Sequence, residues 1–102
     1  MHLKVARARR VRFFYDYGHE WPLWESFTEK YTMEPSDYGL SRELTDVLKR
    51  SYELWIAHAD AALFAHVPAG SDHLWRKLSD QALAMLRFEL ADVAEVVDER
   101  FT

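Results

Sequence analysis

Cysteine is absent from the 102 residues, and glycine and proline occur only three times each. Without cysteine the chain has no disulfide scaffold, no thiolate zinc site and no cysteine nucleophile. Three glycines are too few for a collagen-like repeat, and a hydrophobic share of 49% excludes wholesale disorder. The length fits a single domain over residues 1–102.

Long apolar runs are missing as well. No stretch approaches the roughly 18 consecutive apolar residues that a membrane span needs. The basic start of the chain lacks the apolar block and small-residue cleavage site of a secretory signal. We therefore expect a soluble protein with a cytoplasmic location.

Catalytic signatures are equally scarce, since GxSxG, GxGxxG and P-loop motifs do not occur. His58 and His66 are eight residues apart on a predicted helix, roughly 12 Å along its axis, which is too far to share a metal ion. His19 and Glu20 lack the second histidine of HExxH. We expect no enzyme, no metal and no cofactor; a small carboxylate-dependent hydrolase stays open as the least favoured alternative.

The formal charge of -4 hides a division along the chain. Residues 1–12 carry five basic side chains and no acid, so they hold +5 and residues 13–102 hold -9. The basic side chains are Lys4, Arg7, Arg9, Arg10 and Arg12. This segment is interpreted either as an arm that contacts nucleic acid or as an edge strand that charged residues protect from unwanted pairing. Nucleic-acid binding is the alternative function, because the acidic remainder repels phosphates.

Alternating side chains predict one strand clearly and another weakly. Residues 11–17 alternate with period two and are rich in aromatic residues, which is typical of a strand. Its apolar side would carry Val11, Phe13, Tyr15 and Tyr17. Residues 28–33 form a weaker candidate because Glu29 interrupts the apolar side. Pro22 predicts an extended or turning connection between the two.

Apolar residues at spacings of three and four predict a long helix with Ser41 as its N-cap, running to about Ala65. Its more apolar later half is expected to lie deeper in the core. Pro and Gly within residues 67–72 end it, and Ser71 or Asp72 would cap a second helix. The short connection predicts an antiparallel hairpin. The predicted buried side of the second helix comprises Leu74, Trp75, Leu78, Ala82, Met85, Leu86 and Leu90.

The last segment allows two interpretations. Apolar residues keep helical spacing as far as Phe101, whereas residues 93–99 are rich in β-branched side chains. We favour a strand, because the first strand would otherwise lack a partner for its backbone groups. The predicted fold class is α+β, with a two-helix antiparallel hairpin packed on a small sheet.

Aromatic residues are unevenly placed. The chain has six Phe, five Tyr and four Trp, and nine of these fifteen residues lie within residues 13–38. Six acidic residues lie in the same segment. Some of the aromatic residues fill the core, but Trp21, Trp24 and Phe14 have no predicted core role. Rigid aromatic rings beside carboxylates suit an interface with a basic protein, or with a second copy as a homodimer. The candidate partner-binding residues are Phe14, Glu20, Trp21, Trp24, Glu25, Asp37 and Tyr38.

Two short motifs carry a resemblance. WPLW at residues 21–24 and DYGLS at residues 37–41, followed by Trp55 in the first helix, resemble small uncharacterised bacterial proteins of similar length. The resemblance implies an α+β sandwich with a C-terminal strand, and it implies no catalytic residue. By analogy of size and charge, such proteins look like immunity or antitoxin partners of secreted toxins.

Overall fold

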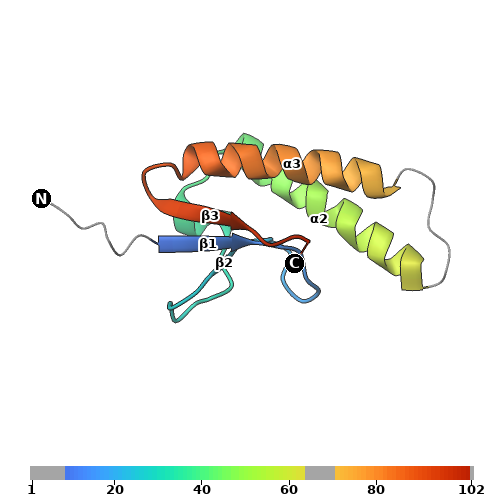
Figure 1. Ribbon diagram of the computed structural model, residues 1–102, viewed down its shortest axis with the longest axis horizontal. Coiled ribbons are helices and arrows are strands. Elements are labelled where there is room, and N and C mark those ends of the chain that lie inside the picture. Colours follow the sequence, from blue (N-terminus) through green and yellow to red (C-terminus); the bar gives the residue numbers. More distant parts are fainter. Residues whose placement is uncertain (1–8, 64–70, 102) are drawn as a thin grey trace, which may run out of the picture.

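Two long helices cover one face of a small mixed sheet in the computed structural model, which describes residues 9–63 and 71–101 (Figure 1). In chain order the elements are β1 (Arg9–Phe13), β2 (Trp24–Glu25), α1 (Pro35–Tyr38), α2 (Arg42–Leu63), α3 (Ser71–Glu89) and β3 (Ala94–Asp98). The strand order is β2-β1-β3. This architecture confirms the predicted α+β class.

The C-terminal strand is confirmed as β3. It pairs in parallel with β1, and Val96 lies opposite Val11. A parallel neighbour requires a long crossover connection, and the two helices supply it. β2 pairs antiparallel on the other side of β1, with Trp24 opposite Arg12. The first strand is therefore central and has partners on both edges.

The predicted strand over residues 11–17 is partly wrong in its bounds, because ladder pairing starts earlier and ends at Phe13. Val11 and Phe13 are fully buried and Tyr15 nearly so, which follows the expected alternation. Tyr17, however, is 50% exposed. Gly18 has a left-handed φ of 88° and reverses the chain, so that Asp16 bridges to His19.

A strand over residues 28–33 is not formed. β2 lies earlier in the chain, and Thr32 contributes only an isolated bridge to Trp24. The Thr28 hydroxyl donates to the Glu25 carbonyl (3.0 Å) and accepts from the Tyr31 amide (3.0 Å), closing a loop. Such local side-chain bonds compete with strand pairing, which explains the difference.

The helix start at Ser41 is confirmed, because its Oγ accepts the Leu44 amide at 3.1 Å. Helices α2 and α3 form the expected antiparallel hairpin (Figure 1). α3 already begins at Ser71, so Ser71 and Asp72 lie within its first turn instead of before it.

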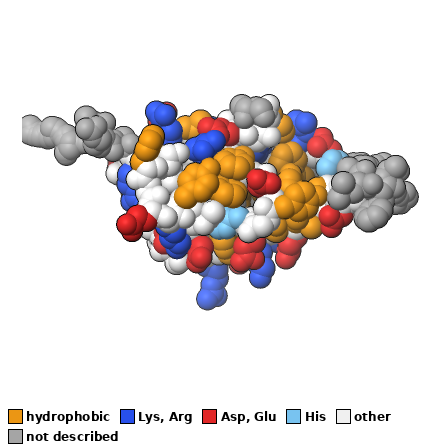
Figure 2. Space-filling model, turned by 90° about the horizontal axis from the view of Figure 1, so that it is seen from below, with side chains coloured by type: hydrophobic (Ala, Val, Ile, Leu, Met, Phe, Trp, Pro, Cys, Tyr) orange, Lys and Arg blue, Asp and Glu red, His pale blue; other side chains and the backbone are white. Residues whose placement is uncertain are grey.

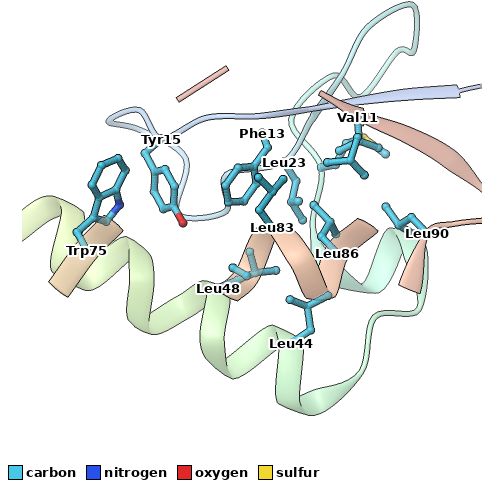
Figure 3. Packing of buried hydrophobic residues seen from close by; sticks show 13 residues of the cluster. Val11, Phe13, Tyr15, Leu23, Leu44, Leu48, Trp75, Leu83, Leu86 and Leu90 are labelled. Carbon is cyan, nitrogen blue, oxygen red and sulfur yellow. The ribbon is translucent and has the colours of Figure 1, made fainter. Parts of the chain in front are cut away.

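The core lies between the sheet, the first half of α2 and the second half of α3. There Leu44, Leu48 and Leu86 pack against Val11 and Phe13 (Figure 3). The later half of α2 does not lie deeper, since residues 54–56 are only half-buried. In the second helix, Leu74 is 55% exposed, contrary to its predicted burial. The reason is length: α2 spans 22 residues, roughly 33 Å, whereas β1 spans five, roughly 17 Å. The helices extend beyond the sheet.

Candidate functional site

The three arginines of β1 are each ion-paired with a carboxylate. The pairs are Arg9–Glu25 (2.8 Å), Arg10–Glu95 (3.1 Å) and Arg12–Glu99 (2.8 Å). These three arginines, which were expected to attract nucleic acid, are therefore paired with carboxylates of the same chain. Lys4 and Arg7, the other two basic residues of the predicted arm, lie outside the described residues.

Glu25 is buried in the interior, and Tyr38 is half-buried against the core. Glu25 is 3% exposed and holds the Arg9 guanidinium with both carboxylate oxygens (2.8 and 2.9 Å). The Tyr38 hydroxyl donates to Glu25 Oε1 at 2.6 Å. Burial alone would raise the pKa of Glu25, but the hydrogen bonds from Arg9 and Tyr38 outweigh it and hold that pKa below its ordinary value. The ionised carboxylate is therefore a structural group.

Substitution of Glu25 by Gln should make the protein less sensitive to acid. A carboxylate with a lowered pKa stabilises the fold above its unfolded pKa, and this contribution is lost as the pH falls through the folded pKa. At pH 7 we expect Glu25→Gln to reduce the free energy of unfolding by about 1–2 kcal/mol. The difference from the wild type should shrink below roughly pH 4.

Urea denaturation at neutral and acid pH measures this difference, and Glu95→Gln is the control. Glu95 faces Arg10 with both side chains more than half exposed, so its loss should cost less than about 0.5 kcal/mol. A Glu25→Gln deficit that stays constant on acidification would assign the effect to packing instead of charge.

Phe14 and Trp24 form an aromatic cluster on the sheet face away from the helices. Because Val11 and Phe13 face the helices, Arg12 and its cross-strand partner Trp24 face the other way. The rings of Phe14 and Trp24 stack with centroids 4.6 Å apart. The indole Nε1 donates to the Phe14 carbonyl at 3.0 Å. Hydrophobic side chains gather over the middle of the view from this side, with acidic ones among them (Figure 2).

Trp24 is only 7% exposed, so the expectation that it has no core role is wrong. Within residues 9–63 and 71–101 no helix covers this face of the sheet, and the ring of Trp24 is covered instead by neighbouring aromatic side chains. These are Phe14, His19 and Tyr31. The cluster therefore acts as a second, smaller core.

Asp37 forms hydrogen bonds with neighbouring residues of the chain. Both of its oxygens accept from Lys30 Nζ (2.9 and 2.7 Å), and Oδ2 also accepts the Glu34 amide at the start of α1 (2.8 Å). The hydrogen bond from Lys30 is the main reason that the pKa of Asp37 is lowered. Its charge is already compensated.

Glu20 and Trp21 remain, and they line an open cavity of about 590 Å³. Its other lining residues are Gly18, His19, Glu34 and Tyr52. The reversal at Gly18 brings Glu20 and Trp21 beside α2, and His19 Nε2 joins this turn to the Met33 carbonyl at 2.8 Å. The structure thus divides the seven candidate residues among separate places and leaves two of them at a cavity.

Tyr52 connects the cavity to further aromatic and acidic residues. Its ring lies 6.1 Å from that of Trp55, which lies 5.0 Å from that of Tyr17. Burial is the main reason that the pKa of Tyr52 is raised. The carboxylates of Glu20, Asp16 and Asp60 and the hydroxyl of Tyr17 raise it further. We call this set the acidic aromatic face: Asp16, Tyr17, Glu20, Trp21, Glu34, Tyr52, Trp55 and Asp60.

The carboxylates of the acidic aromatic face differ from those of the sheet in their pairing. Within residues 9–63 and 71–101, no ion pair forms to Asp16, Glu20, Glu34 or Asp60. These carboxylates lie around Tyr52 and the cavity, and no described side chain forms an ion pair with them. The face therefore carries a negative potential beside exposed and half-buried aromatic rings.

Tyr52 and Trp55 are half-buried, so that each packs against the core and also contributes to the acidic aromatic face. The sequence places Trp55 in the first helix and does not single out Tyr52. The two are three residues apart and so share one side of α2. This spacing was a usable signal, but their exposure follows from the helix extending past the sheet.

Other kinds of site are not found in the described part of the chain. Residues 9–63 and 71–101 contain no group of three or more His, Asp or Glu side chains placed to hold a metal ion. Of the helices described, none combines the length and apolar character that crossing a bilayer requires. No protein-family model, curated protein or solved structure matches the chain.

Proposed function

We propose that this protein binds a basic protein partner through the acidic aromatic face and blocks it by occlusion, as an immunity-like or antitoxin-like inhibitor in the cytoplasm. The observation that carries the proposal is the group of carboxylates around Tyr52 and the cavity that form no ion pair within the described residues. Carboxylates steer a basic partner toward the face, and the rings of Trp21, Tyr52 and Trp55 supply area to bury.

The nucleic-acid alternative has less support. A protein that binds phosphates needs basic side chains that are free to release counterions. The described basic residues of the predicted arm, Arg9, Arg10 and Arg12, instead neutralise carboxylates of the same sheet. Binding of nucleic acid is an outcome that the following experiment detects.

Affinity capture from the native cell, with the full chain as bait, tests the proposal. The wild type should retain a basic protein at low salt and release it as salt is raised. Glu20→Gln combined with Glu34→Gln should weaken retention roughly tenfold, because steering and contact charges are lost together.

The control combines Glu29→Gln with Glu53→Gln, which removes the same charge from exposed positions outside the face. It should retain the partner as the wild type does. Equal capture by both double variants, or a captured species that nuclease removes, would contradict the proposal.

A further inference from the structure

The cavity beside Trp21 and Tyr52 has the composition of a site for an organic cation. Two aromatic side chains and two carboxylates, from Glu20 and Glu34, line it, and both kinds of group attract cations. Its volume of about 590 Å³ lies within the range of small-ligand sites. No Lys or Arg is among its lining residues.

Lys30, a cation close enough to interact with the charge of Glu34, is already bound elsewhere, because both oxygens of Asp37 hold its ammonium group (2.9 and 2.7 Å). His19 also lines the cavity, and its Nε2 contacts the Met33 carbonyl. Because a carbonyl only accepts, this nitrogen carries the hydrogen and donates it to Met33. That donor is therefore already used within the fold.

We propose that the cavity binds the guanidinium group of one arginine side chain of the partner. This inference rests on the proposed function and names the group that the face recognises. Guanidinium fits better than ammonium, because it offers five donors in a plane to several acceptors and stacks on aromatic rings. A cation in this cavity would offset the charges of Glu20 and Glu34, which no ion pair within the described residues offsets.

Titration of the full, ¹⁵N-labelled chain with ethylguanidinium chloride at constant ionic strength tests the site directly. Saturable shifts are expected for the amides of residues 18–21 and for the Trp21 indole, with a dissociation constant on the order of millimolar. Neutral ethylurea, which has a similar shape, should produce no saturable shift. Ethylammonium should bind at least several-fold more weakly.

Variants distinguish the site from general attraction to acidic surface. The double variant Glu20→Gln and Glu34→Gln should weaken ethylguanidinium binding at least tenfold, and Glu29→Gln with Glu53→Gln should leave it unchanged. Unshifted amide signals of β1 and β3 would show that both variants keep the fold. Shifts that do not saturate, that ethylurea reproduces, or that ethylammonium produces more tightly would overturn the inference.

The two proposals can fail separately. Capture of a basic protein that depends on Glu20 and Glu34, without binding of ethylguanidinium, would overturn the cavity site and leave the proposed function standing. Binding of ethylguanidinium by a chain that captures no basic protein would support the cation site and contradict the proposed function.

Discussion

Replacement of Trp24 by alanine is expected to reduce the free energy of unfolding by about 3–5 kcal/mol. The indole is 7% exposed, stacks on Phe14 at 4.6 Å and donates to the Phe14 carbonyl at 3.0 Å. It lies on the sheet face opposite α2 and α3. Its removal leaves a cavity between β2 and the loops and exposes a strand pairing of only two residues. Urea denaturation of the variant measures the loss.

The matched control is Phe27→Ala. Phe27 is an aromatic residue three positions away whose side chain is 106% exposed, so its loss should change stability by less than about 0.5 kcal/mol. If Trp24→Ala loses little stability but no longer captures the partner, Trp24 is an interface residue, as the sequence predicted, and not a core residue.

Trp24 also illustrates where sequence reasoning ends. The main elements carry strong local signals: alternation at Val11 and Phe13 predicts β1, and the hydroxyl of Ser41 before an apolar period predicts the start of α2. β2 has only two residues, which is too short for alternation to be visible. Its existence depends on pairing with β1, at a distance of more than ten residues along the chain.

The same limit applies to Glu25. A glutamate predicts a surface charge, because buried carboxylates are rare unless paired. Its partners, Arg9 and Tyr38, come from 16 positions before and 13 positions after it. Nothing local to residue 25 indicates that both will converge on it.

The acidic and aromatic character of the candidate site was predictable, but the set of residues that makes it up was not. Acidic residues interleaved with aromatic ones predicted a face for a basic partner, and Glu20 and Trp21 lie at the cavity. Tyr52 and Trp55 join them because α2 is about twice as long as the sheet beneath it. The exposure of a helix face depends on the length of what it packs against, which helical periodicity does not contain.

Arg100 is the second position at which a large effect is expected. Its side chain is 4% exposed, and it links the end of β3 to α3. The guanidinium donates to both oxygens of Asp98 (2.9 Å each) and to Ser79 Oγ (2.6 Å), and it pairs with Asp80 (2.8 Å). The hydrogen bonds from Arg100 are the main reason that the pKa of Asp98 is lowered. Removing the cation therefore leaves a carboxylate at this junction without its partner.

Arg100→Met should reduce the free energy of unfolding by about 2–3 kcal/mol at pH 7, less than for a fully buried pair because Asp80 is largely exposed. The double variant with Asp98→Asn should recover part of the loss, since removing both charges avoids an unpaired carboxylate. Arg10→Met is the control, because Arg10 and Glu95 are both largely exposed and their pair should contribute at most about 1 kcal/mol. If Arg100→Met lowers the free energy of unfolding by no more than Arg10→Met, the prediction is wrong. The desolvation of the buried guanidinium would then cancel the energy of its ion pairs, and Arg100 would position the C-terminal segment without stabilising it.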